Sequence, residues 1–450
     1  MSNELKPLHF DADYTMEEAL AEAKRCLNCP RPLCQMGCPI ENEIPRFIQA
    51  IAHGNFGLAN DILAERTNLP AICGRVCPRE NQCEGNCIMN KAKKPPINIG
   101  KLERFAADFE SINELRKPKK IQQNLGNVAV VGSGPAGLSV AGDMAKLGYK
   151  VTVFEGQSEP GGVLLFGIPE FRLSKSVVRR EIARLEGLGV KFVCNIFIGQ
   201  DKTLDDLFAE GFDSIFIGTG THIPQEVRME NDEVHGVFQA MYLLTNVQLV
   251  ENGDLDESLI PVRKGDRVVI IGGGNVAMDA ARTCVRLGCE SVTVAYRRSQ
   301  EQMPALLSEY EEARAEGVQF QWFASPVAVE GKDKVEGFKY EVMALNEDGA
   351  GIHGTGNYQV MPVDKIIIAA GHKPNARLIG EGNNLQVDEK GYIITSEDPY
   401  GMTNRKGVFA GGDVVHKPAT VVLAMREAKK AVDGMVKYME IKKAQDSINQ

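Results

Sequence analysis

Three regions of the chain differ in how apolar and polar residues follow one another. Residues 16–25 and 44–66 repeat apolar positions at helical spacing, which predicts a helical region from residue 1 to about residue 120. The polar stretch 115–127 interrupts this pattern and predicts a linker. The apolar run 127–131 then has the pattern of a strand that leads into a glycine-rich turn and a helix. The chain is therefore expected to be helical first and α/β afterwards.

The succession of strand, glycine turn and helix occurs a second time. It begins again at 267–271, and each copy is followed by another apolar strand, at 151–155 and at 292–296. The short runs 215–220 and 366–371 end in small residues, as buried parallel strands do where their backbone meets a ligand. We predict two Rossmann-like dinucleotide-binding domains, the second inserted in the first. The expected domains are a helical domain at 1–120, a first dinucleotide-binding domain at 121–222 and 372–450, and a second at 223–371.

Composition narrows the class of protein. The 450 residues are 43% hydrophobic and 25% charged, and the net charge of -9 gives no basic surface for nucleic acid. No apolar run approaches the ~18 residues of a membrane span, and the acidic first 20 residues lack the pattern of a signal peptide. We therefore expect a cytoplasmic protein with no membrane or nucleic-acid partner. Eight of the 11 cysteines lie between Cys26 and Cys87, which favours metal ligation over disulfides.

The first glycine turn has the spacing of a dinucleotide-binding fingerprint. Its first glycine permits a tight turn, its second lets the backbone approach a pyrophosphate, and its third allows close helix packing. The helix that follows presents its N-terminus to phosphate. Glu155 ends the next strand 23 residues after Gly132, where a carboxylate accepts ribose hydroxyls, so an adenosine without a 2′-phosphate is expected. The predicted contacts of this turn are Gly132, Gly134, Pro135, Ala136, Gly137 and Glu155.

The second glycine turn differs at the ribose position. The same offset of 23 residues from Gly272 reaches Ala295, which is followed by Arg297 and Arg298 rather than by an acid. Two guanidiniums at this point favour a 2′-phosphate and so NADPH, although arginines of a solvated surface are the alternative. The predicted contacts of this turn are Gly272, Gly274, Asn275, Ala277, Arg297 and Arg298.

Two dinucleotide sites in one chain predict a flavoprotein in which NADPH reduces FAD. The run 408–413 supports FAD because it has the pattern of a strand ending in a tight turn at Gly412, with Asp413 placed to bond the ribityl hydroxyls. The helix after Pro418 would direct its positive end toward reduced flavin. A structural turn with Asp413 as a helix cap is the alternative.

The electrons then need an exit. The segment after Glu155 contains no cysteine, so a dithiol beside the flavin is not expected, and Cys194, Cys284 and Cys289 are interpreted as buried thiols. The remaining exit is the N-terminal set of eight cysteines, in which proline follows Cys38 and Cys77, as it follows a cluster cysteine in ferredoxins. This set predicts two [4Fe-4S] clusters, with structural zinc as the alternative. The set is Cys26-x2-Cys29-x4-Cys34-x3-Cys38-Pro and Cys73-x3-Cys77-Pro-x4-Cys83-x3-Cys87.

The order of these motifs, with GSGPAG, GGVLLFGIPEFRLSK, GGGNVAMD, AYRR and FAGGD, resembles the NADPH-dependent glutamate synthase small (β) subunit family over nearly the whole chain. The same module occurs in dihydropyrimidine dehydrogenase and in the large subunit of the electron-bifurcating NADH-dependent ferredoxin:NADP oxidoreductase. The resemblance leaves Cys73 as a spare thiol. Glu103 replaces a glutamine that pyrimidine-reducing relatives tend to carry, and a solvated helix residue is the alternative for it. The implied cluster ligands are Cys26, Cys29, Cys34 and Cys87, then Cys38, Cys77, Cys83 and Glu103.

The resemblance also implies further contacts and a role. It places Gly162, Arg172 and Thr420 at FAD, and Ala370 and Gly371 beside NADPH and the flavin. One departure is that the segment after Met303-Pro lacks an arginine that relatives often carry there. The implied role is an NADPH-oxidising subunit, without an acid–base pair, in a hetero-oligomer with the glutamate synthase large subunit or another electron-accepting subunit. The alternatives are the bifurcating oxidoreductase subunit, a pyrimidine-reducing subunit, and a non-catalytic scaffold that holds zinc.

Overall fold

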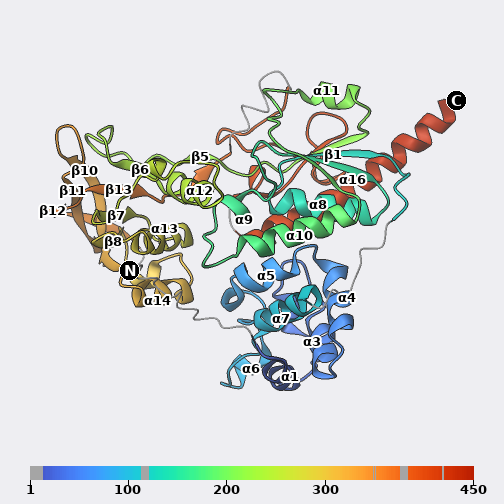
Figure 1. The fold of residues 1–450 in the computed structure, drawn as a ribbon, viewed down its shortest axis with the longest axis horizontal. Coiled ribbons are helices and arrows are strands. Elements are labelled where there is room, and N and C mark those ends of the chain that lie inside the picture. Colours follow the sequence, from blue (N-terminus) through green and yellow to red (C-terminus); the bar gives the residue numbers. More distant parts are fainter. Residues whose placement is uncertain are drawn as a thin grey trace. The chain divides into compact units, whose positions relative to one another are not determined.

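The computed structural model describes residues 14–112, 121–347, 349, 351–374, 384–417 and 420–449 (Figure 1). The first part of the predicted linker, 115–120, and Pro418 lie outside these residues. The described residues divide into two compact units, of which the first comprises those within 166–171 and 224–372 and the second those within 14–165, 172–223 and 373–449. Within the described ranges, no helix is both long and apolar enough to cross a membrane.

The N-terminal region of the second unit is helical, as its apolar periodicity predicts. Thr15 caps the first helix by exchanging hydrogen bonds with Glu18, which fixes its start. The pattern at 44–66 forms two helices, because Asn55 caps a new helix after Gly54. The helices are α1 (Met16–Lys24), α2 (Leu33–Met36), α3 (Ile44–Ala52), α4 (Phe56–Arg66), α5 (Pro70–Val76), α6 (Ile88–Lys91) and α7 (Ile99–Ile112), with the 3-10 turn η1 (Arg79–Asn81).

A parallel five-stranded sheet forms the rest of the second unit. Its order is β15-β4-β1-β2-β3, so β4 pairs with the first strand and the C-terminal strand β15 pairs with β4 at the edge of the sheet. Its strands are β1 (Asn127–Val131), β2 (Lys150–Phe154), β3 (Lys191–Val193), β4 (Ser214–Ile217) and β15 (Val408–Ala410). Around it are α8 (Pro135–Lys146), α10 (Lys175–Gly187), α11 (Leu204–Ala209), η4 (Gly412–Val414) and α16 (Val421–Asn449). The short helix α9 (Val163–Phe166) precedes the segment that belongs to the first unit.

The first unit repeats this arrangement with a second parallel sheet, in the order β6-β13-β7-β8-β9. Its strands are β6 (Val237–Gln239), β7 (Arg267–Ile271), β8 (Ser291–Tyr296), β9 (Gln319–Trp322) and β13 (Lys365–Ile368). Its helices are α12 (Ala240–Glu251), η2 (Glu257–Leu259), α13 (Asn275–Arg286), η3 (Gln300–Gln302) and α14 (Leu307–Ala315). An antiparallel sheet of β10 (Ala324–Glu330), β11 (Gly337–Leu345) and β12 (Ile352–Pro362) was not predicted from the sequence.

The chain passes between the units at a small two-stranded sheet. It consists of β5 (Ile223–Pro224) and β14 (His372–Lys373). The backbone N–H of His222 donates to Lys373 O at 3.1 Å, and that of Gln225 donates to Gly371 O at 2.9 Å. The backbone at the start of the inserted segment is therefore hydrogen-bonded to the backbone at its end. The predicted domain limits at 222 and 372 stay a prediction for the separately folding parts.

Candidate functional site

Four of the N-terminal cysteines line one cavity. Cys26, Cys29, Cys34 and Cys87 surround a space of about 410 Å³, its open mouth included, together with apolar side chains such as Ile48. Burial raises the pKa of the Cys26 thiol, and it raises that of Cys34 to about 11. Thiolates in such surroundings need a positive partner, which ligated iron supplies.

A second cavity of about 390 Å³ holds the other cysteine group. It is lined by Cys38, Cys77 and Cys83 and by Glu103 of α7. Burial raises the pKa of the Glu103 carboxyl to about 8, and the carboxyl accepts one long hydrogen bond, from Asn42 Nδ2 at 3.4 Å. A carboxylate buried at this cost fits a cationic group in the cavity. The other lining residues include Asn42, Cys73, Arg79, Gln82 and Val422.

The spacing of the ligating side chains distinguishes a cluster from a single ion. Four cysteines on one zinc ion would have sulfurs roughly 3.8 Å apart, because each Zn–S bond is about 2.3 Å in a tetrahedron. Across the ranges that the structure describes, no three His, Cys, Asp or Glu side chains are close enough to hold one metal ion. Two separate cavities lined by cysteines fit two [4Fe-4S] clusters.

Cys73 has a different environment from its neighbours. It is buried, and its sulfur lies 3.8 Å from Thr67 Oγ1 and 3.7 Å from Met425 Sδ. It also interacts with the thiol of Cys77, and this contact is the largest cause of the raised pKa of Cys77. Cys73 therefore packs toward α16 while lining the second cavity. Glu103 and Cys73 both remain available as the eighth ligand.

The first glycine turn forms an open cradle at the end of β1. Gly137 must be glycine, because a Cβ there would lie 1.9 Å from Gly132 O and would prevent α8 from packing on the turn. A Cβ on Gly134 would meet nothing within 4 Å, so its backbone faces open space. Pro135 and Ala136 begin α8, and the N-terminus of a helix offers unpaired backbone N–H groups to an anion. This arrangement fits the pyrophosphate of a dinucleotide.

Glu155 is held beside this turn by a residue that the sequence interpretation missed. The backbone N–H of Ser133 donates to Glu155 Oε2 at 3.0 Å, and Ser133 Oγ donates to the same oxygen. Ser133 Oγ in turn accepts from the N–H of Gly161 at 2.8 Å, next to the predicted contact Gly162. One serine therefore joins three loops of the predicted FAD site. The sequence feature that could have identified Ser133 is its position between Gly132 and Gly134.

The other predicted FAD contacts lie in the C-terminal part of the second unit. Gly412 has a φ of 77° and lies against α8, where a Cβ would come within 2.8 Å of Ala136 Cβ. Asp413 follows in η4, and Thr420 Oγ1 accepts from the N–H of Leu423 at 3.3 Å in the first turn of α16. Val422, two residues after Thr420, lines the second cysteine cavity. The start of α16 thus extends from the predicted flavin site to the predicted cluster site, while Arg172 precedes α10 and is half-buried.

The second glycine turn forms a similar cradle in the first unit. A Cβ on Gly272 would lie 2.4 Å from Ala369 O, which requires glycine there, whereas Gly274 faces open space. Asn275 Oδ1 accepts from the N–H of Leu306 at 2.9 Å, so the segment after Met303-Pro closes one side of the turn. The remaining predicted contacts are Ala277, which is buried in α13, and the exposed Arg297, Arg298, Ala370 and Gly371 at strand ends.

Arg297 and Arg298 directly follow β8, at the carboxyl edge of the sheet. Both side chains are exposed, and within the described part of the first unit neither forms a hydrogen bond or an ion pair. Free guanidiniums at this edge fit a phosphate ligand. The neighbouring Tyr296 packs against Gly273, where a Cβ would come within 2.6 Å of the ring.

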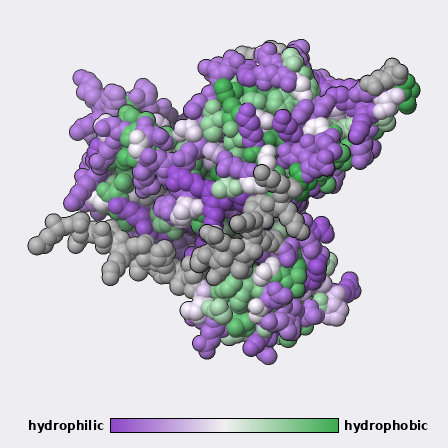
Figure 2. All heavy atoms as spheres, turned by 45° about the vertical axis from the view of Figure 1, so that its right-hand side comes forward, coloured by the Kyte–Doolittle hydropathy of each residue, from purple (hydrophilic) through white to green (hydrophobic). Residues whose placement is uncertain are grey.

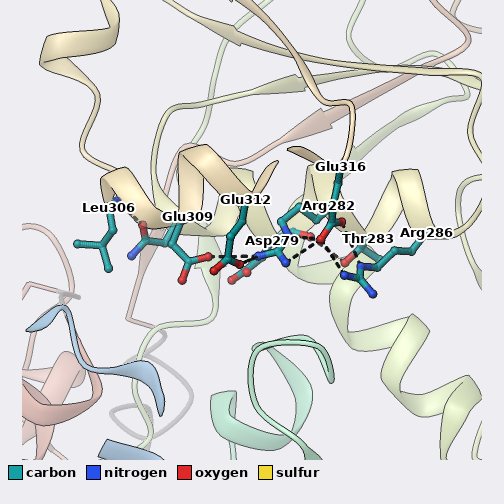
Figure 3. Close-up of polar contacts among 9 residues, drawn as sticks. Asp279, Arg282, Thr283, Arg286, Leu306, Glu309, Glu312 and Glu316 are labelled. Carbon is teal, nitrogen blue, oxygen red and sulfur yellow. Dashed lines mark hydrogen bonds and ion pairs between the residues drawn. The ribbon is translucent and has the colours of Figure 1, made fainter. Parts of the chain in front are cut away.

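A buried ion-pair cluster supports α13 behind this turn (Figure 3). Arg282 is 2% exposed and pairs with Glu312 at 2.5 Å and Glu316 at 2.8 Å, both contributed by the α14 segment. Arg286 shares Glu316 at 2.7 Å. Five N–H donors allow one guanidinium to bind several carboxylates, so the cluster fixes α14 on α13. The sequence interpretation missed these residues, although the acids at 309, 312 and 316 recur at helical spacing.

Comparisons with known proteins agree with this geometry. Residues 6–115 match the family model "Dihydroprymidine dehydrogenase domain II, 4Fe-4S cluster", and residues 126–428 match "Pyridine nucleotide-disulphide oxidoreductase". The solved oxidoreductase FprA of Mycobacterium tuberculosis shares the fold over 71% of this chain and 86% of its own, with a TM-score of 0.61 and 19% identity. The class of protein is thus a pyridine-nucleotide oxidoreductase with an iron–sulfur domain.

Two curated relatives cover nearly the whole chain. The glutamate synthase [NADPH] small chain of Halomonas elongata is 37% identical over 95% of this chain and 92% of its own. The NAD-dependent dihydropyrimidine dehydrogenase subunit PreT of Escherichia coli is 35% identical over 95% of this chain and 96% of its own. The chain belongs to the glutamate synthase small-chain family of pyridine nucleotide-disulphide oxidoreductases. The matches confirm the predicted fold class, resemblance and cofactor types, while the number of clusters stays a prediction.

Proposed function

We propose that this chain is the NADPH-oxidising electron-transfer subunit of a glutamate synthase. In this role it forms a hetero-oligomer with a large subunit that makes glutamate from glutamine or ammonia and 2-oxoglutarate. One observation carries the electron-transfer proposal: α16 begins beside the predicted FAD site at Thr420 and lines the second cysteine cavity with Val422. With FAD at Thr420, the flavin and the second cavity would lie within one turn of helix of each other, which would suit electron transfer between them.

The residues divide into three binding groups. The turn at Gly132–Gly137, with Glu155, Gly162, Arg172, Gly412, Asp413 and Thr420, would hold FAD. The turn at Gly272–Ala277, with Arg297, Arg298, Ala370 and Gly371, would hold NADPH. The two cysteine cavities would hold [4Fe-4S] clusters. When bound, these groups supply hydride transfer from NADPH to flavin and one-electron transfer through the clusters.

The protein's own contribution is positioning and exclusion of water. Hydride transfer depends on the alignment of two rings more than on an acid or a base, so no acid–base pair is assigned. Ser133 keeps Glu155 and the Gly161 loop in register, and the Arg282 cluster keeps α13 in place behind the second turn. The mostly apolar lining of the first cavity, which includes Ile44 and Ile48, limits contact of a cluster with water.

The partner is expected at the helical region. Leu27 is 65% exposed at the first cavity, and Met36, on α2 between Cys34 and Cys38, is 71% exposed. Figure 2 shows apolar side chains gathered on the surface of this helical region. Exposed apolar residues around a redox centre are suited to a protein interface through which electrons leave.

Anaerobic purification of the untagged chain from its own cells tests the proposal. We expect about eight irons and one FAD per chain, with co-elution of a large FMN-containing chain and glutamate formation that depends on NADPH. A small NADH-binding flavoprotein as the partner would indicate a bifurcating oxidoreductase. Uracil-dependent NADPH oxidation would indicate a pyrimidine-reducing enzyme, and zinc without sulfide would refute electron transfer by this chain.

A further inference from the structure

The C-terminus of α13 places two cysteines at the paired positions of a Schellman motif. The N–H of Gly288, whose φ is 83°, donates to Val285 O at 3.0 Å. The N–H of Cys289 donates to Cys284 O at 3.2 Å. These two bonds define the motif, in which the residue two after the helix cap returns to the residue three before it. Side chains at those two positions commonly contact each other, and here both are thiols.

The two thiols differ in access. Cys284 is fully buried in the core of the first unit, and the partly exposed Cys289 packs against the same cluster of apolar side chains. Both are free cysteines in the structure. The pair therefore has one sulfur that a small reagent can reach and one that only its neighbour can reach. This is the arrangement of an attacking thiol and a resolving thiol.

The contact between the thiols also makes them chemically unequal. Cys289 Sγ donates to Arg263 O at 3.8 Å. Interaction with the neighbouring thiol lowers the pKa of Cys289, and the same interaction together with burial raises the pKa of Cys284 well above its ordinary value. The thiolate is the reactive form of cysteine. The more accessible sulfur, that of Cys289, is thus also the one that ionises more readily. Burial and pKa therefore both identify Cys289 as the attacking thiol and Cys284 as the resolving thiol.

We propose that Cys284 and Cys289 form a reversible oxidation site, which hydrogen peroxide converts into an intrachain disulfide. The Cys289 thiolate attacks one peroxide oxygen, the O–O bond breaks, and the departing hydroxide takes a proton to become water. Cys284 then attacks the resulting sulfenic sulfur, the S–O bond breaks, and the departing hydroxyl leaves as a second water with the Cys284 proton. The two thiols lose two electrons in total, and the peroxide gains them.

The position of the pair separates this chemistry from nucleotide binding. Gly274 and the predicted phosphate contacts lie at the N-terminus of α13, whereas Cys284 lies in its last turn. The bridge would join that last turn to the segment that leads into β8 at Ser291. Oxidation therefore needs no access through the glycine turn, and the proposal does not depend on the acceptor assigned to the enzyme.

The chain carries its own readout for this disulfide. Trypsin cleaves after Arg282, Arg286 and Arg297, which places Cys284 in peptide 283–286 and Cys289 in peptide 287–297. We would treat the anaerobically purified holoprotein with equimolar hydrogen peroxide, block free thiols with an alkylating agent and digest. The expected result is a linked pair of these peptides as the main form, lighter by two hydrogens than their sum. Dithiothreitol should separate the pair completely.

Three variants make the result specific. Cys284→Ala should stop Cys289 at the sulfenic acid, which dimedone traps, and Cys289→Ala should leave Cys284 reduced. Cys194→Ser, a change at a half-buried cysteine in the other unit, should leave the linked peptides unchanged. Because each cysteine is read in its own peptide, loss of iron from the clusters does not alter the result. Recovery of both peptides in alkylated form after peroxide, or of Cys289 as an unlinked sulfinic acid in the unmodified chain, would overturn the proposal.

Discussion

The guanidinium of Arg282 lies 4.4 Å from the centre of the Phe171 ring. Arg286, one helical turn later, lies 4.3 Å from the centre of the same ring. The buried Arg282 and the half-buried Arg286 therefore both lie over one aromatic ring. Phe171 ends the segment 166–171, which belongs to the first unit although its neighbours on both sides belong to the second. This contact therefore holds the 166–171 segment on helix α13 within the first unit.

Replacing Phe171 by Leu should lower the free energy of unfolding of the first unit by about 1–2 kcal/mol, because leucine fills space but provides no π face for the two cations. Trp322, the one tryptophan of the chain, lies in β9 of this unit, so its fluorescence in urea reports the transition. Phe171→Tyr keeps the ring and serves as the matched control. Equal stability of the Leu variant and the unmodified protein would show that the ring contributes nothing to the unit.

Removing both Arg297 and Arg298 should change the choice of nicotinamide cofactor. Loss of two charge-assisted contacts to a 2′-phosphate should raise the KM for NADPH by about 10- to 100-fold and leave the KM for NADH nearly unchanged. Steady-state reduction of ferricyanide measures both constants. The exposed Arg228 of the same unit, changed to Ala, is the control. A similar rise for the two cofactors would mean that the arginines do not read the 2′-position.

The eighth cluster ligand can be decided by metal content. If Glu103 binds the second cluster, Glu103→Ala should lower iron from about eight to about four per chain or alter the cluster spectrum, whereas Cys73→Ala should keep about eight irons. Iron and sulfide assays with electron paramagnetic resonance of the reduced protein measure this. The reverse pattern would assign the ligand to Cys73, and no change in either variant would exclude both residues.

Glu181 of α10 is expected to make stability depend on pH. Burial raises its pKa, and the backbone N–H of Ala71 donates to its Oε1 at 3.3 Å. A carboxyl whose pKa is raised by folding binds its proton more tightly in the folded state, so stability falls as pH rises above the unfolded value of about 4.3.

Glu181→Gln keeps the acceptor for Ala71 and removes the buried charge. The variant should therefore be more stable than the unmodified protein by about 1 kcal/mol at pH 7, with a smaller difference at pH 5. Urea unfolding of both proteins between pH 5 and pH 7 measures the difference in their free energies of unfolding. Cluster loss affects both proteins equally, so it cancels in this difference. A variant that is less stable at every pH would show that the pair with Arg184, 3.6 Å away, outweighs the cost of burial.

Met36→Glu should weaken partner binding without affecting the chemistry of the chain. A charge placed on the exposed apolar surface near the first cavity should reduce NADPH-dependent glutamate formation by about 10-fold at limiting partner concentration. NADPH–ferricyanide reduction should stay unchanged, because it requires no partner. Leu147→Glu, at an exposed leucine beside α8, is the control. If both variants support full glutamate formation, the partner binds elsewhere.

The sequence predicted the parts of the fold that local pattern determines. Glycine spacing located both turns. Gly137 is required because the backbone of Gly132, five residues earlier, lies against it, and Gly272 is required because the backbone of Ala369, at the end of a predicted strand, lies against it. Cysteine spacing located the cluster region. The division of ligands that the family resemblance supplied stays a prediction, and the second cavity is lined by Cys73 as well as by the four residues assigned to it. The antiparallel sheet of β10, β11 and β12 was missed; β12 is exposed along nearly its whole length and so carries no apolar alternation.

The contacts that were missed join residues far apart in sequence. Val422 lines a cavity with Cys38, and Phe171 packs on Arg282, but neither relation leaves a period or a motif in the chain. Ser133 carried a weak signal because it stands inside the glycine turn, yet the turn itself constrains only the glycines. The Cys284 and Cys289 pair lacked the familiar two-residue spacing, and only the return of the chain after Gly288 brings the thiols together.

The pairing of β5 with β14 has a consequence for exchanging parts between relatives. Because the two ends of the inserted segment meet at residues 223 and 373, a graft cut there would leave the recipient chain with ends that already match. Such a graft would nevertheless lack residues 166–171, which belong to the same unit but lie upstream. Recombination at this one pair of junctions therefore transplants an incomplete unit. A functional chimaera should carry segment 166–171 from the same parent as the insert.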